Sequence, residues 1–196
     1  MMRRTLSALV IATVLIAGCA APAKRTETPA TAHDTVLLRL PPASLQRTLS
    51  LQQSIEVDYG VGGRREHREL QVLLEADAAH TRLAAIGGGQ VLARLDWDGN
   101  DLKITRAPWA PDAVQPERIL SDLQLSLWPA EAIRQALPQG WRLDDAPTER
   151  RLRQGDEVVM EIRYPDPATT LIEQRRDGYR LTIRTLPAAT TGAGDQ

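Results

Sequence analysis

The chain has 196 residues, of which 42% are hydrophobic and 25% charged, with a formal net charge of -1, a single cysteine and no phenylalanine. This composition is that of an ordinary globular domain and excludes a wholly disordered chain. One cysteine forms no internal disulfide, so a disulfide-stapled secreted module is excluded. The near-neutral charge argues against binding by phosphate neutralisation, and we expect no nucleic-acid partner.

The N-terminal segment has the three parts of an export signal. A basic start is followed by mostly apolar residues 6–17, too few for a permanent membrane span, and by small residues before Cys19. Residues 15–19, LIAGC, also resemble a bacterial lipobox, in which the thiol receives a diacylglycerol before the chain is cut. We therefore predict a lipoprotein signal peptide over residues 1–18 and lipidation at Cys19; the alternative is a plain secretory signal with an incidental cysteine.

Lipidation would anchor the protein to a membrane, because two or three acyl chains bind stably where one is marginal. The segment resembles enterobacterial lipoproteins, in which aspartate after the cysteine favours inner-membrane retention. Ala20 stands there in this chain and favours the periplasmic face of the outer membrane. Residues 19–34, rich in alanine, proline and threonine, are predicted to be a flexible tether, and residues 188–196 a disordered tail.

Residues 35–187 are expected to form one domain, in which apolar and polar residues alternate. The alternation over residues 49–59 predicts a half-buried strand, and the glycines that follow predict a turn. An Asp-Gly-Asn-Asp turn at 98–101 indicates a tight hairpin between two later strands. The other strands predicted in this antiparallel first half cover residues 36–40, 70–74, 82–86, 91–97 and 102–106.

The period then changes to that of a helix. Pro116 lies in the first turn of a predicted helix, in which apolar residues recur at helical spacing up to Leu127. Trp128-Pro129 should break the helix, and a second short helix is expected from Ala130. Strands are predicted again over residues 141–143, 149–153, 157–164, 170–175 and 179–186.

About eleven antiparallel strands with one helical insertion predict a mainly β (α+β) fold. A sheet of this size curls, and the helices can cover its concave face. We therefore expect a curved, open β-barrel whose interior either holds a lipid or is filled by side chains.

Several short motifs occur in an order that resembles a known family. Residues 125–129 (LSLWP), 140–143 (GWRL) and 178–183 (GYRLTI) match a family of uncharacterised bacterial outer-membrane lipoproteins, itself regarded as similar to the LolA/LolB lipoprotein carriers. The resemblance covers residues 36–186. It implies a LolA/LolB-like open barrel, a lipid or acylated ligand and a periplasmic carrier protein as a candidate partner.

The resemblance also indicates one loop residue. In LolB an apolar residue on a protruding loop helps to deliver acylated cargo to the membrane, and the similar position here is Ile86, in the sequence AAIGGG over residues 84–89. LolB has a proline beside this residue that the present chain lacks. The alternative is an ordinary glycine-rich hairpin with Ile86 under the sheet.

Apolar residues on the alternating faces and the helices are candidates to line a cavity. The four tryptophans are notable because they supply most of the large side chains, and Trp128 at the helical break is the strongest of them. Ordinary core packing is the alternative for each one, and Trp109, between prolines, can instead be exposed. The candidates are Leu51, Ile55, Leu70, Val72, Trp97, Leu123, Trp128, Ile133 and Met160.

Motifs for catalysis and metal binding are missing from the sequence. The three histidines have no second ligand at helical spacing, and no HExxH, nucleophile-elbow or Walker pattern occurs. We therefore expect a monomeric binding protein with no catalytic residue, metal or cofactor. The alternatives are a non-enzymatic assembly lipoprotein with a filled core and a protein partner, and a lipid hydrolase, for which no nucleophile and base can be named.

Overall fold

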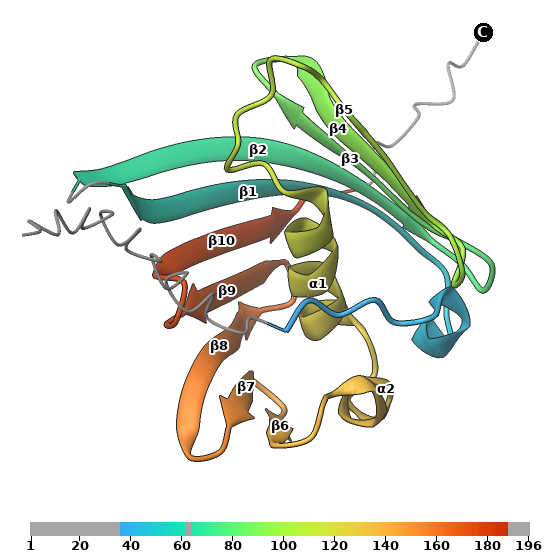
Figure 1. Ribbon diagram of the computed structural model, residues 1–196, viewed down its shortest axis with the longest axis vertical. Coiled ribbons are helices and arrows are strands. Elements are labelled where there is room, and N and C mark those ends of the chain that lie inside the picture. Colours follow the sequence, from blue (N-terminus) through green and yellow to red (C-terminus); the bar gives the residue numbers. More distant parts are fainter. Residues whose placement is uncertain (1–35, 62–63, 188–196) are drawn as a thin grey trace, which may run out of the picture. The chain divides into compact units, whose positions relative to one another are not determined.

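Ten antiparallel strands form one continuous sheet in the computed structural model, which describes residues 36–61 and 64–187 (Figure 1). Their order is β5-β4-β3-β2-β1-β10-β9-β8-β7-β6, and within the described residues the edge strands β5 and β6 do not pair, so the sheet is open. This confirms the predicted mainly β, open architecture. The strands span β1 Leu49–Val61, β2 Arg64–Ala76, β3 Thr81–Gly87, β4 Gln90–Trp97, β5 Leu102–Arg106, β6 Trp141–Ala146, β7 Glu149–Gln154, β8 Glu157–Asp166, β9 Thr169–Gln174 and β10 Tyr179–Thr185.

The strand order determines where the helices lie. Strands β5 and β6 are consecutive in the chain but lie at opposite edges of the sheet, so the segment between them must cross it. It does so through α1 (Pro116–Leu127) and α2 (Ala130–Ala136), and α1 runs in front of the middle strands in Figure 1. The predicted helical insertion over the concave face thus follows from the topology.

Prolines set the bounds of both helices. Pro116 occupies the first turn of α1, where its missing N–H costs no helical hydrogen bond. Trp128 precedes Pro129 and has extended backbone, with φ of -77° and ψ of 157°, because the proline ring disfavours helical geometry in the residue before it. The predicted break at Trp128-Pro129 is confirmed.

The inner face of the sheet and the helices share one hydrophobic core. One part of it, which we name the packed region, lies between the second half of α1, α2 and strands β6–β8. Every side chain of this region is at most 4% exposed. Its members are Leu125, Trp128, Ile133, Leu143, Leu152, Met160 and Ile162.

One predicted strand is wrong: residues 36–40 do not join the sheet, so it has ten strands in the described residues rather than eleven. Their backbone groups bond instead to side chains of α1 and to the indole of Trp97 on β4. The Leu38 N–H donates to Ser121 Oγ at 3.0 Å and the Leu40 N–H to Gln124 Oε1 at 2.9 Å. The Leu40 carbonyl accepts from Gln124 Nε2 at 3.1 Å and from Trp97 Nε1 at 2.8 Å. Polar side chains of α1, together with the Trp97 N–H, thus replace a neighbouring strand.

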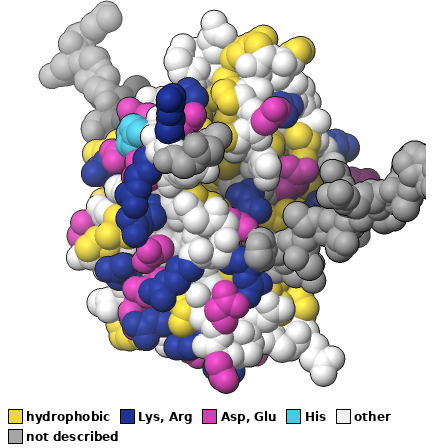
Figure 2. Space-filling view, turned by 60° about the vertical axis from the view of Figure 1, so that its left-hand side comes forward, with side chains coloured by type: hydrophobic (Ala, Val, Ile, Leu, Met, Phe, Trp, Pro, Cys, Tyr) yellow, Lys and Arg dark blue, Asp and Glu magenta, His cyan; other side chains and the backbone are white. Residues whose placement is uncertain are grey.

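The outer face of the sheet carries cross-strand ion pairs. Glu161 on β8 lies within 4.0 Å of Arg151 on β7, Arg163 on its own strand and Arg175 in the turn after β9. Figure 2 shows basic and acidic side chains interspersed over the face that it presents, with hydrophobic side chains gathered near the upper end. Among the described residues, neither helix is long and apolar enough to cross a membrane.

Candidate functional site

A groove of about 510 Å³ lies on the concave side, between the first half of α1 and strands β1, β2 and β10. This volume is within the roughly 300–1,000 Å³ that is usual for small-molecule pockets. The strands contribute mainly aliphatic side chains and α1 contributes two more. The aliphatic lining consists of Ile55, Val57, Leu70, Ile119, Leu123, Leu181 and Ile183.

The register of the three strands explains why this lining is continuous. Ile55 on β1 is paired with Leu70 on β2 and with Ile183 on β10, so three apolar side chains lie in one row across the sheet. The next inward row pairs Val57 with Leu181. Since side chains alternate between the two faces of a strand, one correct register places both rows on the concave face.

A polar cluster of Arg118, Asp122, Asp177 and Tyr179 lies at the end of the groove where β10 begins. The Tyr179 hydroxyl donates to the Asp122 carboxylate, with oxygen–oxygen distances of 3.1 and 2.9 Å. Arg118 Nη1 lies 2.7 Å from Asp177 Oδ2 and 3.5 Å from the Tyr179 hydroxyl, and its guanidinium carbon is 5.6 Å from the centre of the Tyr179 ring. Helix α1 is thereby fixed to the start of β10.

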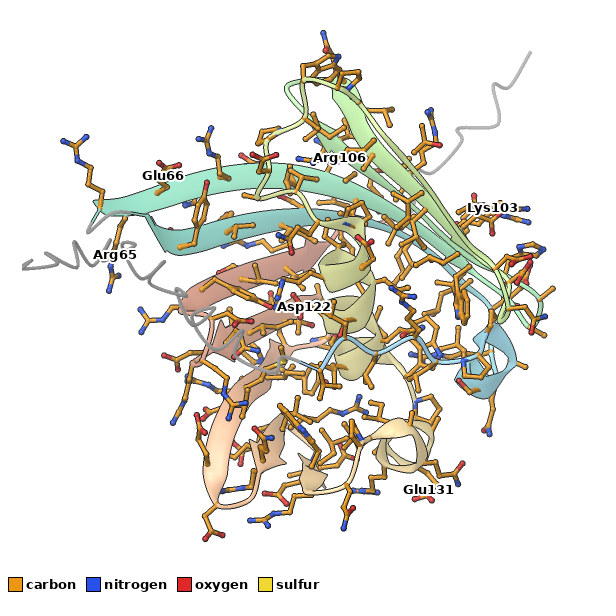
Figure 3. All side chains as sticks on the ribbon, viewed as in Figure 1. Arg65, Glu66, Lys103, Arg106, Asp122 and Glu131 are labelled. Carbon is orange, nitrogen blue, oxygen red and sulfur yellow. The ribbon has the colours of Figure 1, made fainter. Side chains whose placement is uncertain are left out.

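Burial changes the acid–base properties of this cluster. Asp122 is only 5% exposed, and Figure 3 shows it on α1 against the strands. Burial disfavours its charged form and raises the pKa of Asp122 from 3.8 to about 7, although the Tyr179 hydrogen bond and the charge of Arg118 oppose the rise. Burial likewise raises the pKa of Tyr179. Near neutral pH the groove therefore contains a carboxyl group that is partly protonated.

These features can hold a molecule that has an apolar part and a polar end. The aliphatic rows provide the apolar surface, and the cluster provides a hydroxyl, a guanidinium and carboxyl groups. The part of the chain that the structure describes holds no group of three or more His, Cys, Asp or Glu side chains placed to bind a metal ion.

Comparison with protein families matches residues 50–187 to a family described as "Protein of unknown function (DUF3261)". The chain belongs to the DUF3261 family. The prediction of membership in an uncharacterised family is thus confirmed. A comparison with curated proteins found no match.

Two solved structures are similar to the DUF3261 chain. One is a LolA superfamily protein from Nitrosomonas europaea, with 10% sequence identity and a TM-score of 0.35, covering 76% of this chain and 93% of that one. The other is a DUF1329 family protein from Desulfovibrio piger, with 8% identity and a TM-score of 0.33, covering 74% of this chain and 87% of that one.

The nine predicted cavity residues divide between the groove and the core of the DUF3261 domain. Ile55, Leu70 and Leu123 line the groove. Leu51 is half-buried and packs against the hydrophobic core. The remaining candidates are buried in that core and do not line the groove: Val72, Trp97, Trp128, Ile133 and Met160.

Ile86 lies inside strand β3 and is half-buried, paired with Gln71 on β2 and Val91 on β4. The turn itself consists of Gly88 and Gly89, whose φ angles of +57° and +74° are those of a tight hairpin that glycine adopts without strain. Trp109, in the loop before α1, is 56% exposed.

The remaining predictions fall on parts of the DUF3261 chain outside the described residues. Cys19, the signal peptide over 1–18, the tether over 19–34 and the tail over 188–196 all lie there. Lipidation and membrane anchoring therefore stay predictions.

Sequence reasoning missed the polar cluster of the DUF3261 domain. Asp122 stands between Leu120 and Leu123, on the face of α1 whose spacing indicates burial, and an aspartate there is a usable signal. Its partners were not identifiable, because Tyr179 is 57 residues further along the chain.

Proposed function

We propose that this protein binds a lipid or acylated molecule in the groove and assists its transfer or localisation at the periplasmic face of the outer membrane, anchored through lipidated Cys19. The observation that carries the proposal is the groove itself: about 510 Å³, lined by seven leucine, isoleucine and valine side chains and with a largely buried polar cluster at one end. The proposed role is binding rather than catalysis. The membrane anchor rests on the sequence of residues 1–19.

The groove is suited to an acyl chain for a physical reason. Hydrocarbon gains free energy when it leaves water for aliphatic surface, and this gain needs no directional contact, so the rows of leucine, isoleucine and valine accept a flexible chain. The first half of α1 differs from the segment over the packed region. Ile119 and Leu123 leave an open groove between the helix and the sheet, whereas the indole of Trp128 fills the corresponding space in the packed region. An open groove is what a ligand-binding barrel requires.

A matched pair of variants on strand β2 tests this proposal. Leu70 faces the groove, and Leu73 is 41% exposed and does not line it. Leu70→Trp should fill the groove, whereas Leu73→Trp adds the same indole elsewhere. Binding of the neutral dye N-phenylnaphthylamine to the purified full chain is followed by fluorescence, and lipids that co-purify are extracted and identified by mass spectrometry.

We expect Leu70→Trp to weaken dye binding by roughly tenfold or more, as loss of a few buried methylenes does, and to reduce the co-purified lipid. Leu73→Trp should behave as the unchanged protein does. If the unchanged protein binds neither dye nor lipid, or if both variants bind equally well, the groove is not a lipid site.

A further inference from the structure

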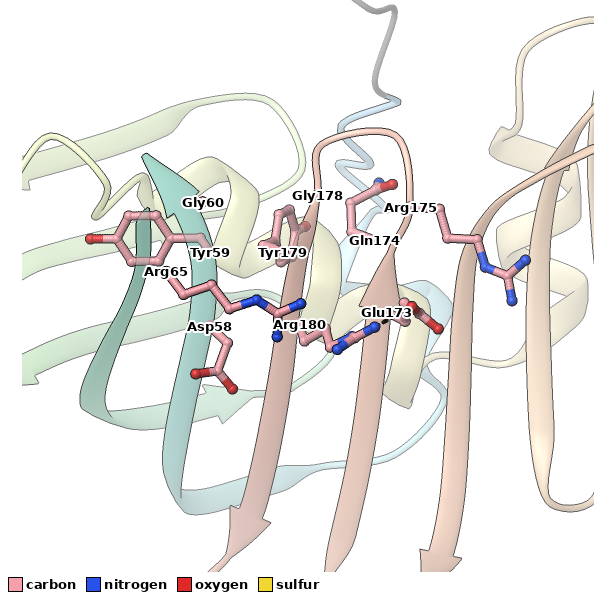
Figure 4. A pocket seen from close by; sticks show the side chains of 10 residues that line it. All are labelled: Asp58, Tyr59, Gly60, Arg65, Glu173, Gln174, Arg175, Gly178, Tyr179 and Arg180. Carbon is pink, nitrogen blue, oxygen red and sulfur yellow. Dashed lines mark hydrogen bonds and ion pairs between the residues drawn. The ribbon is translucent and has the colours of Figure 1, made fainter. Parts of the chain in front are cut away.

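A second cavity, of about 290 Å³, adjoins the groove at the same end of the sheet (Figure 4). The two cavities share three lining residues: Tyr59, Gly60 and Tyr179. The second cavity also has lining residues on the outer face of the sheet, among them Arg65 and Arg180, and it is lined by Arg175 from the turn after β9. We name it the outer cavity.

The two cavities meet because the strands end at different points. Pairing between β1 and β10 ends at Tyr59 and Tyr179, whereas β1 continues beside β2 with Gly60 opposite Arg65. Gly60 therefore has no partner on β10. A Cβ atom built on Gly60 would approach only the Arg64 carbonyl oxygen, at 4.0 Å, and one built on Gly178 would meet nothing within 4 Å. Two glycines thus leave an open notch between the concave and outer sides.

The charges around the outer cavity favour an anion. Its lining contains three arginines and two carboxylates, Asp58 and Glu173. Asp58 Oδ1 is 2.9 Å from His67 Nδ1, and Glu173 Oε1 is 3.1 Å from Arg180 Nη2, so an anion would share Arg180 with Glu173. The Asp58 carboxylate raises the pKa of His67 through this hydrogen bond. Arg175 Nη2 is 2.9 Å from Glu161 Oε2 and is engaged on that side. The side chain of Arg65 makes no hydrogen bond or ion pair within the described residues, although its backbone pairs with Gly60 in the sheet.

Arg65 and Arg180 come from different strands and both line the outer cavity. Figure 4 shows Arg65 reaching across β1 towards β10, and Arg180 reaching from β10 towards Glu173, with which it pairs. A guanidinium group presents donors in a planar fork that matches a carboxylate or a phosphate. The pair is therefore placed to hold an anionic group whose apolar part passes the notch into the groove.

We infer that the outer cavity is a head-group site, and that the preferred ligand is an amphiphile with an anionic head, carboxylate or phosphate. Its chain lies in the groove, and its head passes Gly60 and Gly178 to reach Arg65 and Arg180. This inference rests on the proposed function, since it needs the groove to hold the chain. It adds the class of head group and the residues that recognise it.

The test compares ligands that differ only in the head. Displacement of N-phenylnaphthylamine by dodecanoic acid, dodecyl phosphate and uncharged dodecanol is measured on the purified full chain. The same measurement is made on the double variant Arg65→Gln with Arg180→Gln. We expect the double variant to bind the acid and the phosphate roughly tenfold more weakly and the alcohol unchanged. Arg184→Gln, four residues further on β10 and outside the lining, is the matched control and should change neither.

The outcomes separate the inference from the proposed function. If the dye and dodecanol bind but the double variant holds the acid as tightly as the unchanged protein does, the head-group site is wrong and the groove stands. If no ligand binds, the proposed function fails. Inorganic phosphate or acetate competing as well as the amphiphiles do would indicate a site for free anions and would overturn the inference.

Discussion

The groove and the packed region are built on the same sheet and the same helix, yet one is open and the other filled. In both, alternating residues give the strands an apolar inner face. The difference lies in what the helices present. Over the packed region Trp128 directly follows α1 and α2 adds Ile133, both fully buried. Over the groove α1 presents Arg118, Ile119 and Asp122.

This contrast shows that strand patterning decides which face is apolar but not whether that face is covered. Covering is decided by the size and polarity of a few helical side chains, and by Pro129, which turns the chain so that α2 closes over the packed region. The polar cluster holds α1 in place over the groove without filling it. Changes in the two regions should therefore have different consequences.

The largest effect is expected from Trp128→Ala in the packed region. Trp128 is fully buried, and its indole N–H has no hydrogen-bond partner among the described residues, so the loss comes from packing. Removing a buried tryptophan costs about 3–5 kcal/mol in free energy of unfolding, because a cavity remains. Urea denaturation followed by circular dichroism measures it.

Trp109→Ala is the matched control for this change, since Trp109 is 56% exposed. Its free energy of unfolding should change by less than about 0.5 kcal/mol. Equal losses in the two variants would mean that Trp128 does not close the packed region, and the contrast between the two regions would lose its basis.

The next effect concerns pH and the groove. Unfolded Asp122 loses its proton near its ordinary pKa of 3.8, whereas folded Asp122 holds it until about pH 7. Between these values the folded state binds more protons, so the free energy of unfolding decreases as pH rises and levels off above pH 7. Asp122→Asn has no titrating group at this position and should remove this decrease. The decrease itself should be a few kcal/mol, because each unit of pKa shift corresponds to about 1.36 kcal/mol.

Thermal unfolding of the unchanged protein and of Asp122→Asn, measured from pH 4 to pH 8, gives the difference in their free energies of unfolding at each pH. Asp144→Asn, which changes an aspartate that pairs with Arg153 at 2.7 Å, is the control and should keep the decrease of the unchanged protein. A difference between wild type and Asp122→Asn that stays constant over this pH range would contradict the buried position of Asp122.

Much of this fold could be predicted from the sequence because the strongest signals are local. Alternation in β1, the proline that starts α1 and the break at Trp128-Pro129 each act within a few residues. Residues 36–40, Val-Leu-Leu-Arg-Leu, are apolar enough to be taken for a strand, but their hydrogen-bond partners on α1, Ser121 and Gln124, are more than eighty residues away. A local pattern gives no information about which distant group satisfies the backbone.

The site was harder to predict for the same reason. Ile55, Leu70 and Leu123 line the groove, whereas Val72 and Met160 show the same pattern and lie in the core. Periodicity identifies the inner face, but the distinction between cavity and core depends on the strand register and on the helix opposite. The polar cluster joins α1 to β10, and no spacing in the sequence links them.

The smallest of these effects is expected in the packed region, where Arg150 on β7 holds the end of α1. Its Nη1 donates to the Leu125 carbonyl at 2.8 Å and to the Trp128 carbonyl at 2.9 Å, and its Nε to Asp145 at 2.8 Å. These carbonyls lie at the end of the helix, where no helical N–H is available to them. Arg150→Met keeps the length of the side chain but removes the donors, and should cost about 1.5–3 kcal/mol in free energy of unfolding.

Urea denaturation of Arg150→Met and of Arg142→Met, a half-exposed arginine 3.7 Å from Asp156, separates this role from the general loss of an arginine. Arg142→Met should change stability by less than about 1 kcal/mol, because exposed ion pairs contribute little. The Arg150 variant should still bind N-phenylnaphthylamine, since Arg150 does not line the groove. If it loses the dye and the stability together, the end of α1 supports the groove as well as the packed region, and the two regions are less independent than their packing implies.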